Sequence, residues 1–300
     1  MKMLDKFMQG VFPILSTPSD KEGNIVFDDI RKQVDWMIDN GVHGIGIAIA
    51  SEIFKYSEKE RDQILSTVVD QVNGRVKVVM NTGGESTDLS IHYSRRAIEL
   101  GADALMIRPA TFIPTTSKEI INYFFEISNQ VSCPIFMQDQ FNARVTPSMA
   151  IECAKRSENL CYIKVESPPT IPRISELFNL KGDINLVVFG GAGGAYCVEE
   201  FCRGSVGTMP GSTIPDIWVS IWDKYKSNDI EGAFYIQNKF SPLIKILSQP
   251  LGLSSAIYKY ILIRRGVFSV GSGYVRGPSL HPDQIHFKEI DKLLEELGLL

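Results

Sequence analysis

The chain has 300 residues, of which 44% are hydrophobic, and its formal net charge is −4. This length suits one large domain or two small ones, and no block of like charges indicates a nucleic-acid or membrane surface. The four histidines and five cysteines show no spacing typical of metal ligands, so we expect no bound metal. The apolar run at the N-terminus is too short for a signal peptide, and we expect reduced thiols in a cytoplasmic protein.

Eight short apolar runs, most of them rich in Val, Ile or Met, alternate with amphipathic helical runs along the chain. The apolar runs cover residues 11–15, 44–50, 76–80, 104–107, 134–137, 161–165, 185–189 and 205–209. Each is short enough to be a buried strand. The helices between them have recognisable starts, because Ser57 with Glu60 and Thr116 with Glu119 form capping boxes.

Eight strand–helix units in a row predict an α/β fold in which a parallel sheet closes into a (β/α)8 TIM barrel. A doubly wound open sheet is the alternative, and the count of eight with even spacing favours the barrel. The strand signal stops at about residue 230, and residues 230–247, 254–265 and 282–298 are predicted helices. We therefore expect a barrel over residues 1–228 and a helical C-terminal extension over residues 229–300, packed on the barrel.

The sixth apolar run, CYIKVESPP, carries a lysine within a predicted strand. Alternation puts Tyr162, Lys164 and Glu166 on one face and the apolar residues 161, 163 and 165 on the other. If the apolar face meets the helices, Lys164 points into the barrel, where desolvation frees its amine to attack a carbonyl. Glu166 could then move a proton at the neighbouring carbon. The alternatives are a lysine that reaches solvent and a structural ion pair between Lys164 and Glu166.

Polar residues follow the fifth predicted strand, which ends in PIFMQDQFNAR. The active sites of barrel enzymes lie at the C-terminal ends of the strands, so these residues are candidates. Asp139 could be an acid or a base, Gln138 could bind a hydroxyl, and Arg144 could pair with a substrate carboxylate. The alternative for each is an ordinary polar loop.

Two further loops could approach a ligand through their backbone. The second strand ends in IAIASEIF, where Ser51 and neighbouring amides such as that of Ala50 could hold a carboxylate. The seventh strand ends in FGGAGGAY, where glycines such as Gly191 allow close approach, although tight packing is the commoner reason for such glycines. No GxGxxG motif stands in the required register, so we expect no dinucleotide cofactor.

Together these segments resemble the dihydrodipicolinate synthase/N-acetylneuraminate lyase family of Schiff-base enzymes. The matching segments are GVFPILSTP (10–18), GVHGIGIAIASE (41–52), ELGADALMIRPA (99–110), CPIFMQD (133–139), YIKVES (162–167) and FCRGSVGTMPG (201–211). The resemblance covers nearly the whole chain. It implies that Lys164 is the Schiff-base residue, that the partner is a small 2-oxo acid without a cofactor, and that the protein is a homotetramer or homodimer.

The chain departs from the synthases of this family, which move protons through a threonine and two tyrosines. Ile49 and Ala50 stand where the family has a Thr–Thr pair, Met137 stands where it has a tyrosine, and the loop after the fourth strand reads PAT at 109–111. The segments MQD (137–139), KVES (164–167) and SE (51–52) resemble instead the branch that includes 2-keto-3-deoxy-arabonate dehydratase.

This second resemblance implies dehydration of a 2-keto-3-deoxy sugar acid through an imine on Lys164. Glu166 would then remove the C3 proton, Asp139 or a water would assist the leaving C4 hydroxyl, and Ser51 with neighbouring amides would hold the carboxylate. The alternatives are pyruvate-dependent aldol cleavage or a synthase-type condensation, a non-catalytic barrel that binds a 2-oxo acid, and a metal-dependent aldolase. The scarcity of histidine argues against the last.

Overall fold

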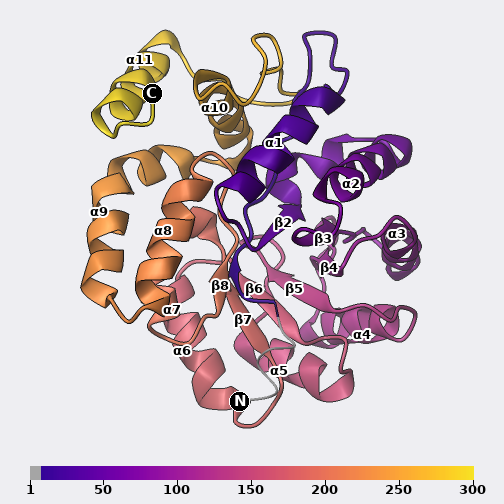
Figure 1. Cartoon of the computed structure of the whole chain (residues 1–300). Coiled ribbons are helices and arrows are strands. Elements are labelled where there is room, and N and C mark those ends of the chain that lie inside the picture. The colour runs from indigo at the N-terminus through magenta and orange to yellow at the C-terminus, as the bar shows by residue number, and fades with distance from the viewer. Residues whose placement is uncertain (1–7) are drawn as a thin grey trace.

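The computed structural model describes residues 8–300 and contains eight parallel strands in one sheet. The strands are β1 (Gly10–Val11), β2 (Gly44–Ile47), β3 (Lys77–Asn81), β4 (Ala104–Ile107), β5 (Ile135–Asp139), β6 (Tyr162–Val165), β7 (Val187–Gly190) and β8 (Gly207–Thr208). Their order is β1-β8-β7-β6-β5-β4-β3-β2, so β2 to β8 lie side by side in sequence order and β1 lies beside β8 (Figure 1).

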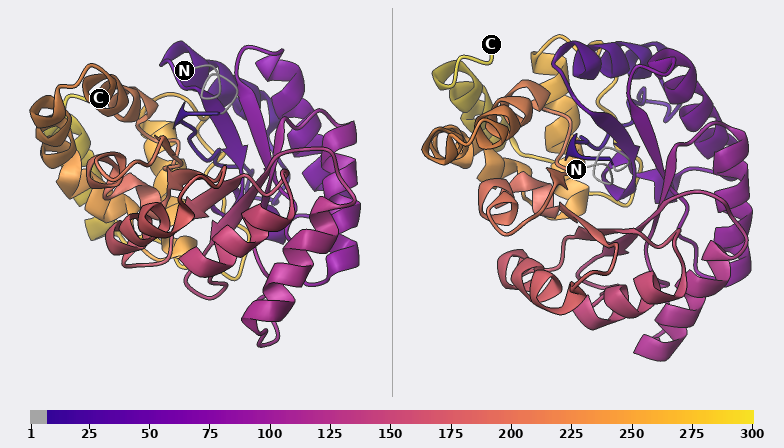
Figure 2. Two further views of the ribbon diagram at one scale, coloured as in Figure 1. Left: turned by 90° about the horizontal axis from the view of Figure 1, so that it is seen from below. Right: turned by 60° about the horizontal axis from the view of Figure 1, so that its bottom comes forward.

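The sheet closes on itself through the segment that follows β1. Ile14 forms parallel bridges with Gly46 of β2 on one side and with Gly211, beyond β8, on the other. Figure 2 shows the helices in a ring around the strands. The prediction of a (β/α)8 barrel is therefore confirmed.

Eight helices alternate with the strands and cover the outside of the sheet. They are α1 (Phe27–Asp39), α2 (Glu58–Val72), α3 (Thr87–Glu99), α4 (Ser117–Ser128), α5 (Pro147–Arg156), α6 (Thr170–Lys181), α7 (Cys197–Phe201) and α8 (Pro215–Lys226). Both predicted capping boxes are present, with Ser57 accepting from the Glu60 amide and Thr116 from the Glu119 amide. Each box satisfies amide hydrogens that the first helical turn leaves unpaired.

The strands are buried on both faces, so the barrel has two apolar layers, one between strands and helices and one inside the barrel. The outer layer joins strands to helices and includes Met137 and Ile163. The inner layer fills the barrel with aromatic rings: Phe136 and Tyr162 stack at a centroid distance of 4.3 Å, and Phe189 meets Phe136 edge to face at 5.3 Å. Burial of each such side chain stabilises the fold by roughly 1.5–3 kcal/mol. Tyr162 lies two residues before Lys164 on β6, and Phe189 of β7 is in register with Lys164.

Alternation along β6 is as predicted from Tyr162 onward, with Tyr162 inside and Ile163 outside. The prediction is wrong for Cys161, which contacts the inner cluster. Cys161 precedes the strand, so the alternation of the strand does not govern its direction. All five cysteines are free thiols, and four of them are buried.

Three helices follow the barrel: α9 (Ile230–Leu247), α10 (Leu251–Arg264) and α11 (Gln284–Glu296). Figure 1 shows them in orange and yellow along one side of the ring. A shared apolar cluster, which includes Trp218 of α8, Leu243 of α9 and Ile257 of α10, joins them to the barrel. The helical extension is thus present, and the division at residues 228 and 229 stays a prediction. No helix among residues 8–300 has the length and apolar character to cross a membrane.

Candidate active site

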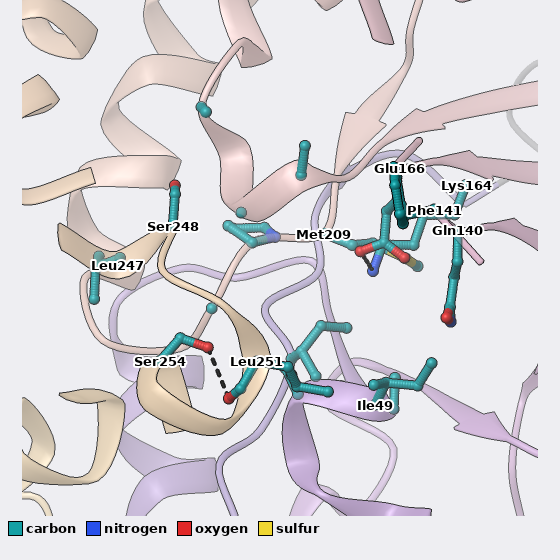
Figure 3. Close-up of a pocket in the computed structure, with 18 of the residues that line it drawn as sticks. Ile49, Gln140, Phe141, Lys164, Glu166, Met209, Leu247, Ser248, Leu251 and Ser254 are labelled. Atoms are coloured by element: carbon teal, nitrogen blue, oxygen red, sulfur yellow. Dashed lines mark hydrogen bonds and ion pairs between the residues drawn. The ribbon is translucent and has the colours of Figure 1, made fainter. Parts of the chain in front are cut away.

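A cavity of about 670 Å³ opens where the strands end, between the barrel and the start of α10. Lys164 and Glu166 reach it from β6, Gln138 from β5, and Ile49 and Ala50 from the loop after β2. In Figure 3 the side chains of Lys164 and Glu166 meet on one side of this cavity, while Leu251 and Ser254 of α10 face it from the other. The four predicted site residues Lys164, Glu166, Gln138 and Ala50 therefore share one cavity.

Lys164 lies near the end of β6 with its side chain 3% exposed. Its Cα is in register with those of Gln138 in β5 and Phe189 in β7. Phe136 and Tyr162 of the inner layer lie two residues before Gln138 and Lys164 on the same strands, and Lys164 lines the cavity. Its Nζ is 2.8 Å from Oε1 of Glu166, within reach for proton exchange. A primary amine in this position has the access to a ligand carbonyl that imine formation requires.

A chain of polar side chains orients the carboxylate of Glu166. Its Oε2 accepts a hydrogen bond from Nε2 of Gln138 at 2.7 Å. Gln138 in turn accepts at Oε1 from Nδ2 of Asn81 at 3.0 Å. Asn81 ends β3 and was not singled out from the sequence, although its place at a strand end was a usable signal. The amides leave Oε1 of Glu166 for Lys164 and hold the carboxylate in place.

Gly191 does not line the cavity but supports Glu166 from behind. A Cβ atom at this position would collide with Cγ of Glu166, so only glycine leaves room for that side chain. The next residues, Ala192 and Gly193, do reach the cavity. Gly191 therefore allows the close approach of a protein side chain, that of Glu166, where the sequence predicted the approach of a ligand.

Asp139 lies one residue beyond Gln138 and faces the other way. It is 1% exposed and does not line the cavity. Its Oδ1 accepts from the amide of Val145 at 2.9 Å, and its Oδ2 accepts from the amide of Ser167 and from Nη1 of Arg173 at 2.8 Å. Burial raises the pKa of Asp139, and the hydrogen bonds and Arg173 oppose this effect. The carboxylate ties together the loops after β5 and β6.

Ser51 also lies outside the cavity, and its hydroxyl is fully used by the protein. It donates to the carbonyl of Leu15 at 2.5 Å and accepts from the amide of Ala48 at 3.1 Å. These bonds close the turn over residues 48–52, which contains the short helix η2 (Ile49–Ser51). In the described part of the chain the amides of Ile49 and Ala50 have no hydrogen-bond partner, so they are the free donors of this turn.

Arg144 is exposed and absent from the cavity wall. Its guanidinium carbon lies 5.7 Å from the ring centroid of Phe141. Phe141, with Gln140 and Asn142, does line the cavity mouth. The loop after β5 therefore meets the cavity through residues 140–142.

The structure corrects the comparison of the fifth strand with the family pattern. Met137 packs in the outer layer against the helices, so a proton-carrying side chain at its position could not reach the cavity. The position that points inward is Gln138. An amide therefore stands where a tyrosine was expected, and the absence of a phenol at this strand end is unchanged.

The C-terminal extension supplies part of the wall that sequence reasoning missed. Tyr258 and Ser254 of α10 line the cavity, as do residues 247–251. The Tyr258 hydroxyl donates to the carbonyl of Leu247 at 3.1 Å, and Ser254 donates to the carbonyl of Leu251 at 3.0 Å. Burial raises the pKa of Tyr258 to about 12. No sequence motif marks these residues, because only tertiary packing brings the helix to the strand ends.

Across residues 8–300 no three His, Cys, Asp or Glu side chains are grouped so that they could hold a metal ion. The cavity offers the buried amine of Lys164, the carboxylate of Glu166 and the side-chain amide of Gln138, and Ile49 and Ala50 of the turn line its wall.

The model of the dihydrodipicolinate synthetase family matches residues 7–297 of the chain. The chain belongs to this family. It is therefore an enzyme of a Schiff-base lyase family whose members act on small 2-oxo acids, and the resemblance seen in the sequence is confirmed.

Named relatives carry two different activities. L-2-keto-3-deoxyarabonate dehydratase of Azospirillum brasilense is 29% identical over 284 residues, which are 92% of this chain and 90% of that protein. The 4-hydroxy-tetrahydrodipicolinate synthase of Methanococcus vannielii is 26% identical over 302 residues, which are 98% of this chain and 100% of that protein. The crystal structure of dihydrodipicolinate synthase from Thermotoga maritima has the same fold, with a TM-score of 0.91 and 22% identity over 98% of this chain and all of that one.

Proposed function

We propose that the protein dehydrates a 2-keto-3-deoxy sugar acid through an imine on Lys164. The observation that carries this proposal is the pairing of Lys164 with Glu166 inside a cavity where an amide, Gln138, occupies the strand end that a phenol would need for a synthase relay. The similarity to L-2-keto-3-deoxyarabonate dehydratase supports the same activity.

The proposed reaction begins when the Lys164 amine attacks the C2 carbonyl and water leaves, which forms the imine. Glu166 is 2.8 Å from the amine and can exchange protons with it during this step. The protonated imine withdraws electrons and acidifies the proton on C3. Glu166 removes this proton and the electron pair forms an enamine.

The C4 hydroxyl then leaves with its bonding electrons as the enamine re-forms the imine. Asp139 does not line the cavity, so we assign the proton for this leaving group to Glu166, which carries the one taken from C3. The hydroxyl departs as water, and hydrolysis of the imine returns the Lys164 amine and a 2-oxo acid lacking one water. Atoms and charges balance without a cofactor.

We propose that the free amides of Ile49 and Ala50 hold the substrate carboxylate. Backbone donors that converge in a turn are suited to an anion, and both residues line the cavity. In this proposal Ser51 shapes the turn through its own two hydrogen bonds and does not touch the ligand.

Aldol cleavage is the competing activity, since it uses the same imine and breaks the C3–C4 bond instead. The test is product analysis by mass spectrometry after incubation with 2-keto-3-deoxy acids of five and six carbons. Dehydration gives a product lighter than the substrate by one water and no pyruvate. Release of pyruvate and an aldehyde from every substrate would overturn the proposal.

A further inference from the structure

A buried ion pair links the C-terminal extension to the turn over residues 48–52. Nζ of Lys259 in α10 lies 2.7 Å from Oε2 of Glu52, and the two side chains are 1% and 2% exposed. Lys259 also donates to the carbonyl of Tyr274 at 2.7 Å, which fixes the amine from the side of the extension. Neither residue lines the cavity.

Glu52 ends the turn that contains Ile49 and Ala50. Its backbone has φ of 59° and ψ of 24°, a left-handed conformation that non-glycine residues adopt at a cost. The surrounding structure must hold such a residue in place. Its Oε1 pairs with Lys55 at 3.0 Å and its Oε2 with Lys259. Two cations thus hold the carboxylate of Glu52 at the end of the turn that the hydrogen bonds of Ser51 close.

The helix that provides Lys259 also borders the cavity. Tyr258 and Ser254, on the same helix, line its wall. Burial lowers the pKa of Lys259, and Glu52 opposes that effect while Lys55 and Arg276 add to it. A well-packed apolar pair would join a helix to a turn at least as well as buried charges do. The pair therefore calls for an explanation beyond stability.

We propose that Lys259 is a positioning residue for carboxylate binding: through Glu52 it fixes the turn whose Ile49 and Ala50 amides receive the substrate carboxylate. This inference rests on the proposed function, because it assigns the turn to the carboxylate of a 2-oxo acid. It makes substrate binding depend on docking of the C-terminal extension, while the imine chemistry of Lys164 does not depend on it.

The experiment uses the full chain and pyruvate, the smallest 2-oxo acid with the required carboxylate and carbonyl. Borohydride trapping at increasing pyruvate concentrations gives the half-saturating concentration and the maximal extent of imine formation. For Lys259→Met we expect a half-saturating concentration raised on the order of 10- to 100-fold, the effect of a displaced binding group, with the same maximal adduct. Lys259→Arg should recover most of the loss. Lys292→Met, at an exposed lysine of α11, is the matched control and should leave both values unchanged.

The double variant Glu52→Gln, Lys259→Gln covers the case in which the single variant fails to fold. It removes both charges of the Glu52–Lys259 pair together, and Lys55, which loses its carboxylate, keeps its hydrogen bond to the carbonyl of Arg276. We expect a folded protein, checked by its thermal unfolding, whose half-saturating concentration is still raised. A folded variant, single or double, that binds pyruvate within about twofold of the unsubstituted protein would overturn the inference. If the unsubstituted protein itself traps no pyruvate, the proposed function fails instead.

Discussion

Two carboxylates, Glu166 and Asp139, stand at neighbouring strand ends and have opposite surroundings. Glu166 lines the cavity, and its partners are the Lys164 amine and the Gln138 amide. Asp139 is buried behind the strands, where Arg173 and two backbone amides use both of its oxygens. The same chemical group is therefore available to a ligand in one place and committed to the fold in the other.

The difference arises from the alternation of the strands. Residues of one strand point alternately into the barrel and toward the helices, so Gln138 and Asp139 must separate. Glu166 follows the last residue of β6, and its side chain lines the same cavity as that of Lys164. Position along the strand thus decides which carboxylate can do chemistry, and three substitutions test this comparison.

The largest effect is expected for Glu166→Gln. The amide keeps the size of the side chain and cannot take the C3 proton, so turnover should fall by about 10²- to 10⁴-fold. The imine with pyruvate should still form, since Lys164 keeps its place. Steady-state kinetics with a 2-keto-3-deoxy acid and borohydride trapping measure the two steps separately. Turnover near that of the unsubstituted enzyme would rule out Glu166 as the base.

Gly191→Ala tests the same carboxylate without changing it. The added methyl group collides with the Glu166 side chain and should displace it from Lys164. We expect turnover to fall by roughly 10- to 100-fold with little loss of folded protein. Gly277→Ala, at a position outside the left-handed region where an added methyl meets nothing, is a control for the loss of glycine itself. Equal kinetics for the two variants would mean that the placement of Glu166 is unimportant.

Asp139→Asn should act on stability more than on chemistry. It leaves the half-buried Arg173 without its carboxylate, and we expect a loss on the order of 3 kcal/mol in the free energy of unfolding. The folded fraction should keep turnover within about tenfold of the unsubstituted enzyme. Chemical denaturation and kinetics on the same sample check both. A loss of turnover as large as that of Glu166→Gln, in a stable protein, would return Asp139 to the active site.

Another buried carboxylate, Glu200 of α7, has no ion-pair partner among residues 8–300. Its Oε1 accepts from the Thr170 hydroxyl at 2.7 Å, and burial raises its pKa to about 8. The folded state then holds a proton that the unfolded state releases above its ordinary pKa of 4.5. The stability due to this group is complete below about pH 4.5 and is lost as pH rises toward about 8.

Glu200→Gln removes this dependence, because an amide does not titrate. Thermal unfolding from about pH 5 to about pH 9 should show the unsubstituted protein losing stability relative to the variant, by a few kcal/mol at the upper end. Parallel curves for the two proteins would show that Glu200 keeps its ordinary pKa in the folded state.

The barrel was predictable because eight apolar runs with helices between them leave few alternatives. The direction in which the β5 side chains point was not predictable. Residues 135–137 are apolar and the strand is buried on both faces, so the sequence pattern does not show whether Gln138 or Asp139 points into the barrel. Lys164 was accessible to sequence reasoning because a charged residue within an apolar strand needs an explanation.

Other parts of the site depend on contacts that sequence spacing does not encode. Ser51 looked like a ligand-binding hydroxyl, and its bonds to Leu15 and Ala48 exist only in the folded turn. Tyr258 and Lys259 are far from the strands in sequence and reach the cavity and Glu52 through the packing of α10.

The central claim is that Lys164 forms the imine, and borohydride reduction with pyruvate followed by peptide mass spectrometry tests it most directly. The account predicts one stable adduct, located on Lys164, and none in Lys164→Met. An adduct on another lysine, or no adduct with any 2-oxo acid in the folded protein, would contradict it.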